Sequence, residues 1–239
     1  MNRERRIFPD PETACEALAQ DFVTTVARAL EKAARFTVAL AGGVTPARFY
    51  RLLAQAPYRE RLAWERLHVF FGDERFVPPD HPDSNYRMAR ETLLDHVPIP
   101  AANVHPMPTQ GLTLPAAAQR YETHLLECFA GPPQLDWVLL GLGEDGHTAS
   151  LFPGFEPPPE VWVAAVASAP KPPPQRLTLT YRTFNQARQA VFLATGPGKA
   201  EIVARVFTRP ELNLPAQRIV PREQLSWYLD EAASAHLST

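Results

Sequence analysis

A histidine in a glycine-rich loop is the residue of this sequence best suited to transfer protons. His147 lies in the segment GLGEDGHTASLFPG at 141–154, and the carboxylate of Asp145 precedes it by two residues. An imidazole titrates near neutral pH and can act as a general base or acid, and a neighbouring carboxylate can orient its ring. Because the loop directly follows the apolar run LDWVLLG, we interpret His147 as a catalytic candidate rather than as a structural histidine.

The same loop contains the spacing G-x-G-x-x-G, which is also the fingerprint of dinucleotide-binding turns. We reject that interpretation because Glu144 and Asp145 would place two carboxylates beside a pyrophosphate, and because no acidic residue at 161–171 could hold a ribose. A Ser-His-Asp triad formed with Ser150 is also rejected, since the chain has no G-x-S-x-G motif and residues so close in one turn rarely converge. Acid–base chemistry by His147 is the interpretation that is left.

The segment AGGVTP at 41–46 has the composition of an anion site. Gly42 and Gly43 let the backbone approach a ligand, a helix that begins here turns free N–H groups outward, and Thr45 adds a hydroxyl. The alternative is an ordinary strand-to-helix turn in which Thr45 caps the helix and Pro46 occupies its first position. The local sequence does not decide between these two interpretations.

Charged residues stand at the ends of three further predicted elements. Asp73, Glu74 and Arg75 follow the apolar run LHVFFG, and the arginine could bind a phosphate with two parallel hydrogen bonds. Arg176 begins the run RLTLT, and Lys199 lies in the first turn of a predicted helix, where a cation opposes the helix dipole unless both share an anion. A solvated charged turn and an ordinary exposed lysine are the alternatives at 73–75 and at 199.

The elements that must position these residues alternate between strand and helix. Apolar runs predict strands at 36–41, 67–72, 135–141, 161–166, 176–180 and 189–195, and helical periodicity predicts helices at 11–35, 45–53, 84–94 and 198–207. This order indicates a single doubly wound α/β domain over residues 1–239, with one mostly parallel sheet and helices on both faces. Ligands bind such sheets beyond the carboxyl ends of the strands, which is where the loops described above must lie.

The composition excludes several classes of protein. The chain has 239 residues, 45% of them apolar, and its net charge of −2 provides no general attraction for nucleic acid or for an anionic membrane. No apolar run approaches the length of about 20 residues that spans a membrane. The charged N-terminal segment, interrupted by Pro9 and Pro11, lacks the apolar stretch of a signal peptide. We therefore expect a cytoplasmic protein without nucleic-acid or membrane partners.

The cysteines and the remaining histidines do not indicate a metal site. Cys15 and Cys128 lie far apart without metal-ligand spacing, and we expect reduced, mostly buried thiols. The other histidines lack a spacing such as H-x-x-x-H and are interpreted as structural or exposed: His68, His81, His96, His105, His124 and His236. We predict no bound metal.

Proline is the most unusual component of the composition. The chain has 26 prolines in 239 residues, about twice the usual share. Many lie in or beside the predicted ligand loops, where reduced loop entropy favours a preformed site. The triplets at 157–159 and 172–174 have no assigned function, and we expect both loops to be surface features.

Five segments of the chain together resemble the 6-phosphogluconolactonase family. They are AGGVTP, FFGDERFVPPDHPDSNYR, LGLGEDGHTASLFPG, RLTLT and ATGPGKAEIV, and their order and spacing are those of the family over almost the whole chain. The block DGHTASLFPG is the most specific. The family is similar in fold to glucosamine-6-phosphate deaminases, whose segment after DGH typically reads like FNEPG. One departure is Ala41, where relatives often carry a serine, which removes one hydroxyl from the candidate phosphate loop.

The resemblance implies hydrolysis of 6-phospho-D-glucono-1,5-lactone to 6-phosphogluconate. It implies no metal and no organic cofactor, and the small-molecule partner is the phosphorylated sugar lactone. The catalytic candidates are His147, Asp145 and Arg75, and the residues expected to bind the substrate or its phosphate are Gly42, Gly43, Thr45, Asp73, Arg176 and Lys199. The alternatives are a deaminase-like isomerase and a non-catalytic sugar-phosphate-binding protein. The sequence leaves the oligomeric state open, with a monomer as the working hypothesis.

Overall fold

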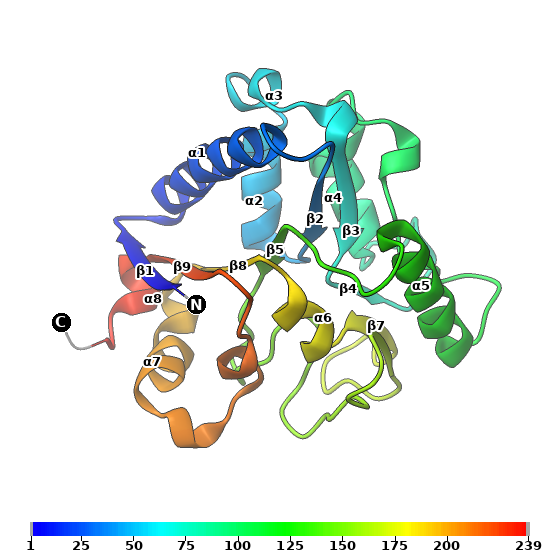
Figure 1. Cartoon of the computed structure of the whole chain (residues 1–239). Coiled ribbons are helices and arrows are strands. Elements are labelled where there is room, and N and C mark those ends of the chain that lie inside the picture. Colours follow the sequence, from blue (N-terminus) through cyan, green and yellow to red (C-terminus); the bar gives the residue numbers. More distant parts are fainter. Residues whose placement is uncertain (1, 238–239) are drawn as a thin grey trace.

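A six-stranded parallel sheet forms the centre of the molecule (Figure 1). The computed structural model describes residues 2–237, so Met1 and residues 238–239 of the predicted domain lie outside the described residues. Across the sheet the strands are β1 (Asn2–Phe8), β9 (Gln224–Asp230), β8 (Gln189–Ala194), β5 (Trp137–Leu140), β2 (Phe36–Leu40) and β3 (Leu67–Phe71). All neighbours in this sheet pair in parallel, which confirms the predicted mostly parallel arrangement.

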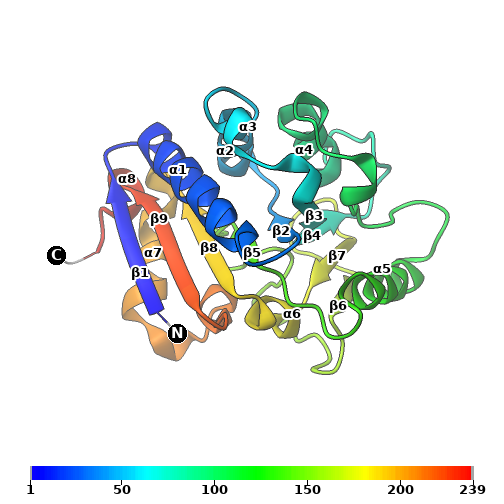
Figure 2. The same ribbon diagram turned by 45° about the horizontal axis from the view of Figure 1, so that its top comes forward.

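Helices cover both faces of this sheet, as predicted (Figures 1 and 2). One face is covered by α1 (Pro11–Leu30) and α2 (Val44–Leu53), and the other by α7 (Ala200–Thr208) and α8 (Glu231–Ser234). The entry to α1 follows the sequence closely, because Asp10 accepts a hydrogen bond from the Thr13 N–H at 2.7 Å and Pro11 occupies the first turn. The remaining α-helices are α3 (Tyr58–Arg61), α4 (Asn85–Thr92), α5 (Leu114–Phe129) and α6 (Tyr181–Gln186).

A second, antiparallel sheet lies beside the first and is not in the prediction. Its strands run in the order β4 (Asp73–Arg75), β7 (Arg176–Leu179) and β6 (Val163–Val166). The sequence prediction was wrong to treat 73–75 as a loop and to place all strands in one sheet. The chain changes sheets at Gly72, whose N–H donates to the carbonyl of Leu40 and whose carbonyl accepts from the N–H of Leu179. Two edge-region strands, β1 and β9, and the helix α5 are further additions to the predicted set.

A contiguous apolar core joins the two sheets. It contains residues of the parallel strands, such as Val38 and Leu139, and residues of the antiparallel strands, such as Leu177 and Leu179, all at most 2% exposed. Helix α5 packs against β6 and β7, and so closes the outer side of the small sheet (Figure 2). Among the described helices, none is sufficiently long and apolar to cross a membrane.

Candidate active site

The loops singled out in the sequence converge on a cavity of about 290 Å³. Four of them follow β2, β3, β5 and β8, so the cavity lies beyond the carboxyl ends of the parallel strands, as this fold class predicts. Its lining consists of Ala41, Gly42, Asp73, Arg75, Gly141, Leu142, Gly143, His147, Ala149, Phe152, Lys171, Pro172, Arg176 and Lys199. Six predicted site residues are therefore brought together here. The other three, Gly43, Thr45 and Asp145, lie in the same loops without lining the cavity.

The imidazole of His147 is held by its neighbouring carboxylate. Nδ1 of His147 lies 2.5 Å from Oδ1 of Asp145, which also accepts the backbone N–H of His147 at 3.2 Å. The ring packs against Phe152 at a centroid distance of 4.5 Å, and 19% of the histidine side chain remains exposed. Because Nδ1 is engaged by the carboxylate, Nε2 is the nitrogen that is left for proton transfer.

The pKa of Asp145 is set by two opposing effects. Partial burial raises it, but the hydrogen bond and the charge of His147 act in the other direction and hold it below its ordinary value. The carboxylate is therefore ionised at neutral pH and can stabilise an imidazolium that forms when His147 accepts a proton.

Gly143 allows the histidine ring to lie where it does. A Cβ atom at this position would stand 2.0 Å from Nδ1 of His147, which no side chain can occupy without displacing the imidazole. The loop then closes on itself, because the Gly143 N–H donates to the carbonyl of His147 at 2.8 Å, and Gly146 takes a φ of +85°. The glycines of this G-x-G-x-x-G segment thus serve the histidine rather than a pyrophosphate.

Asp73 is a buried carboxylate on the cavity wall. Its Oδ2 accepts a hydrogen bond from Ser150 Oγ at 2.6 Å, and its Oδ1 accepts from Asn85 Nδ2 at 3.2 Å. The same asparagine lies against the first loop, since a Cβ on Gly42 would stand 2.0 Å from Asn85 Oδ1. Asn85 therefore fixes the position of Asp73 relative to the loop after β2.

Glu74 points away from the cavity and holds the start of α4. Its carboxylate accepts the backbone N–H groups of Arg75, Asn85 and Tyr86 at 2.7 to 2.8 Å, and the hydroxyl of Ser84 at 3.1 Å. Burial raises the pKa of Glu74 to about 7, while these backbone donors act in the opposite direction. The residue is thus a structural cap within the Asp-Glu-Arg segment.

Two arginines face one another on the cavity side of the small sheet. Arg75 and Arg176 are register partners across the antiparallel pair β4 and β7, so their side chains leave the sheet on the same face. Arg176 is 6% exposed and donates to the carbonyls of residues 171–173. The pKa of Arg176 is lowered mainly by burial, and repulsion by the charge of Arg75 lowers it further. Like charges placed directly opposite are unfavourable, so an anion between them would relieve the pair.

Arg75 has one donor that forms no hydrogen bond in the described part of the chain. One of its terminal nitrogens donates to the carbonyl of Asp83 at 2.8 Å. Its Nε is buried and has no hydrogen-bond partner within residues 2–237. A buried N–H without a partner is costly, and a bound substrate that accepts from it would remove that cost.

The first loop and the last loop add helix N-termini to the site. Helix α2 begins at Val44 with Gly43 as its N-cap, and in the described chain no side chain caps it. The alternative expectation, in which Thr45 caps this helix, is therefore wrong, and the hydroxyl of Thr45 pairs instead with Thr195 Oγ1 at 3.1 Å. Lys199 stands at the N-cap of α7, where burial and the charge of Lys171 lower its pKa while the carboxylates of Glu144 and Asp145 oppose this shift.

Lys171 and Pro172 are cavity residues that the sequence did not indicate. The loop at 172–174 is on the surface, as expected, but it also wraps around Arg176 and carries Lys171 to the cavity mouth, 3.9 Å from Glu144. Treating it as a surface feature without a role was therefore an incomplete prediction. A proline-rich run carries no local sign of what it packs against, so the sequence offered no signal for this contact.

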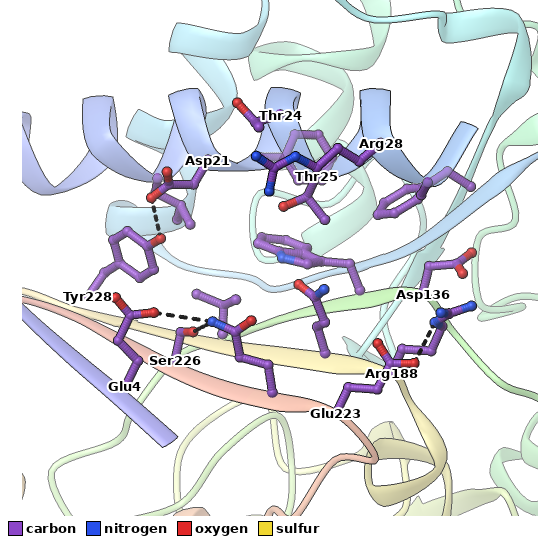
Figure 3. A pocket seen from close by; sticks show the side chains of 18 of the residues that line it. Glu4, Asp21, Thr24, Thr25, Arg28, Asp136, Arg188, Glu223, Ser226 and Tyr228 are labelled. Carbon is purple, nitrogen blue, oxygen red and sulfur yellow. Dashed lines mark hydrogen bonds and ion pairs between the residues drawn. The ribbon is translucent and has the colours of Figure 1, made fainter. Parts of the chain in front are cut away.

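A second cavity, of about 540 Å³, lies between α1 and the strands β1, β8 and β9 (Figure 3). Several of its charged side chains are paired: Asp21 accepts from the hydroxyl of Tyr228 at 2.5 Å, and Arg188 Nε lies 3.0 Å from Glu223. It sits beside the beginnings of β8 and β9 rather than beyond their carboxyl ends. Paired charges at this end of the sheet make it a weaker candidate for catalysis than the cavity around His147.

Comparison with known proteins identifies one family. The sequence pattern of the family described as glucosamine-6-phosphate isomerases/6-phosphogluconolactonase matches residues 9–227. A 6-phosphogluconolactonase from Nostoc sp. is 41% identical over 245 residues, covering all of both chains. A 6-phosphogluconolactonase from Synechocystis sp. is 44% identical over 221 residues and covers 90% of each chain.

Solved structures give the same result. The 6-phosphogluconolactonase of Trypanosoma brucei superimposes with a TM-score of 0.87 at 32% identity, and the match covers 99% of each chain. A monomeric glucosamine-6-phosphate deaminase superimposes with a TM-score of 0.82 at 20% identity, covering 99% of this chain and all of the other. The deaminase shares the fold, and the lactonases share both the fold and a larger part of the sequence.

Proposed function

Because its sequence matches the family over residues 9–227, the chain belongs to the glucosamine-6-phosphate isomerase/6-phosphogluconolactonase family, and we propose that the cavity around His147 is its lactonase active site. The enzyme hydrolyses 6-phospho-D-glucono-1,5-lactone to 6-phospho-D-gluconate, the second step of the oxidative pentose phosphate pathway. Full-length similarity to lactonases supports this assignment. The assignment of the site rests on one observation. A histidine held by a carboxylate and four cationic side chains surround one cavity.

The cationic side of the cavity suits the phosphate. A phosphate monoester carries about −1.5 to −2 charges and accepts several strong hydrogen bonds. We assign it to Arg176, Lys199 and Gly42, which line the cavity, and to the N–H groups of Gly43 and Thr45, which continue the same loop into the start of α2. Lys171 lies at the same mouth and adds a fourth positive charge to those of Arg75, Arg176 and Lys199. Anchoring the phosphate fixes the distance of the lactone carbonyl from His147 and turns binding energy into orientation.

The histidine side of the cavity suits hydrolysis. Nε2 of His147 takes a proton from a water molecule while the water oxygen attacks C1 of the lactone, and Asp145 stabilises the imidazolium. The tetrahedral intermediate then collapses, the bond from C1 to the ring oxygen breaks, and the imidazolium returns its proton to that oxygen. We assign stabilisation of the oxyanion to the guanidinium of Arg75, and acceptance of a hydrogen bond from a sugar hydroxyl to Asp73, since both residues line the cavity.

The test follows the disappearance of freshly generated lactone against its spontaneous hydrolysis. We expect the wild type to accelerate the reaction and His147→Ala to lose about 100-fold or more in kcat. Asp145→Asn keeps the hydrogen-bonding shape but loses the charge, and we expect an intermediate loss. Equal rates for wild type and His147→Ala would remove the base from the scheme, and no acceleration by the wild type would remove the lactonase assignment.

A second substrate separates the related activities. Glucosamine 6-phosphate tests for the deaminase-like reaction by release of ammonia, and we expect none above background. A protein that binds 6-phosphogluconate without accelerating either reaction would instead be a sugar-phosphate-binding protein. The monomeric state, the cytoplasmic location and the lack of nucleic-acid partners remain predictions, which light scattering, cell fractionation and a DNA-binding assay test.

A further inference from the structure

Four side chains form a cluster beside β3 that has no part in the cavity around His147. The cluster consists of His68, His105, His124 and Cys128, and none of these residues lines that cavity. The sequence interpretation of these histidines as structural or exposed did not indicate that they lie together with Cys128. The missed signal is the spacing H-x-x-x-C at 124–128, which places both side chains on one face of α5.

Three donor atoms of the cluster converge on one point. His105 Nδ1 lies 2.9 Å from His124 Nε2, and Cys128 Sγ lies 3.5 Å from His124 Nε2 and 4.0 Å from His105 Nδ1. In a tetrahedral zinc site, bonds of about 2.0 Å to nitrogen and about 2.3 Å to sulfur separate the ligand atoms by about 3.3 to 3.6 Å. The observed separations lie on both sides of these values, so small side-chain rotations suffice to receive a metal.

The position of His105 is fixed by its surroundings. Its N–H donates to the carbonyl of Val69 at 2.8 Å, its own carbonyl accepts from the hydroxyl of Tyr121 at 2.9 Å, and its ring stacks on Phe70 with centroids 4.3 Å apart. His105 Nε2 also lies 3.1 Å from Nδ1 of His68. With Nδ1 on a metal, the Nε2–H of His105 would donate to His68, which is the outer hydrogen bond that metal-bound histidines normally make.

One donor of the cluster borders the surface. His124 lines a surface groove of about 420 Å³ together with Thr123 and Glu127, and Cys128 is only partly buried, so the cluster lies close to solvent.

We propose that His105 Nδ1, His124 Nε2 and Cys128 Sγ bind one Zn²⁺ ion, with a water molecule as the fourth ligand and His68 as the hydrogen-bond acceptor that orients His105. Two imidazoles and a thiolate are the donor set that zinc prefers. Binding displaces the proton of the Cys128 thiol, so one proton is released per ion bound. The site does not depend on the proposed lactonase function, since its residues and those of the active-site cavity are different.

Cobalt provides the direct test on the full-length protein, freed of metal by chelation. Co²⁺ is expected to give one equivalent of visible absorption typical of tetrahedral cobalt, together with a thiolate-to-cobalt charge-transfer band in the near ultraviolet. Zn²⁺ should abolish both. We expect Cys128→Ser to remove the charge-transfer band, His124→Gln to weaken binding at least tenfold, and His68→Phe to weaken it by about 10-fold or more.

Two matched variants serve as controls for the cobalt spectrum. Cys15→Ser removes the other cysteine, and His147→Ala removes the active-site histidine, so both must retain the spectrum. Cys128→Ser must remain folded by circular dichroism and retain lactone hydrolysis, and Zn²⁺ should raise the melting temperature of the wild type but not of Cys128→Ser. Two results would overturn the proposal: no charge-transfer band in the wild type, or a band that persists in Cys128→Ser. The cluster would then be a set of hydrogen-bonded histidines that binds no metal.

Discussion

Gly143 decides where the imidazole of His147 can lie. A methyl group at this position would meet Nδ1 at 2.0 Å, so Gly143→Ala must turn the ring away from Asp145. Because misplacing a catalytic group by about 1 Å can cost about 100-fold, we predict a loss of that order in kcat/KM for the lactone. The loss should appear in kcat more than in KM, since the cationic side of the cavity is untouched.

Gly198→Ala is the control for this substitution. A Cβ atom on Gly198 meets nothing within 4 Å, and its φ lies outside the left-handed region. We expect this variant to hydrolyse the lactone within about twofold of the wild type and both variants to show the wild-type circular dichroism. Full activity in Gly143→Ala would mean that the close approach of the ring to the backbone has no catalytic role.

The candidate catalytic residues could be predicted from the sequence, but the residues that hold them in position could not. His147 and Asp145 are close in sequence, so a local motif sufficed to pair them, and the structure brings them to 2.5 Å. Gly143 could be recognised as a turn residue, but not as the glycine under the histidine ring. Lys171 lies in a proline-rich run that reaches the cavity only because its carbonyls surround Arg176. Contacts of this kind depend on how the chain folds back and have no local signature.

Lys199 lies at the N-terminus of α7, where its positive charge is unfavourable until an anion binds. Burial and Lys171 lower the pKa of this ammonium, and the positive end of the helix is also unfavourable to it. A bound phosphate favours the charged form. Affinity for 6-phosphogluconate should therefore fall as pH rises through the lowered pKa of Lys199, because the free protein then must regain a proton in order to bind.

Isothermal titration calorimetry with 6-phosphogluconate between about pH 7 and 10 measures this effect. This pH interval lies below the ordinary pKa of lysine. Lys199→Arg keeps its charge throughout, so its dissociation constant should stay nearly constant where that of the wild type rises up to about tenfold per pH unit. Parallel weakening in both proteins would assign the alkaline loss to another group.

Elements with a strong apolar pattern were predicted well, and those defined by pairing were not. β2, β3, β5 and β8 are mainly apolar and almost entirely buried, and the sequence places them within a residue or two. β4 is three residues long and charged, and it forms because its partner β7 lies alongside and because Glu74 accepts backbone N–H groups at the start of α4. Pairing between distant segments is a tertiary effect that period and propensity do not report.

The two sheets share one contiguous apolar core. The small sheet has strands of three and four residues, which bury too little apolar surface to be stable alone. Its stability comes from the large sheet, through the common core that contains Leu177 and Leu179. Tyr121 of α5 adds a second link, because its hydroxyl accepts from the N–H of Phe71 at the end of β3.

We therefore propose that the chain is one domain and predict that both sheets unfold together. Trp162 precedes β6 in the small sheet and is 7% exposed, while Trp227 lies in β9 and stacks on Phe192 with centroids 4.0 Å apart. Variants that keep one of these tryptophans, with phenylalanine at the other three tryptophan positions, report on each sheet separately. In each variant the urea midpoint by fluorescence should equal its own midpoint by far-ultraviolet circular dichroism. If the Trp162 variant instead lost fluorescence at lower urea than circular dichroism, the small sheet would open first, and the arginines that it holds over the cavity would be lost before the fold.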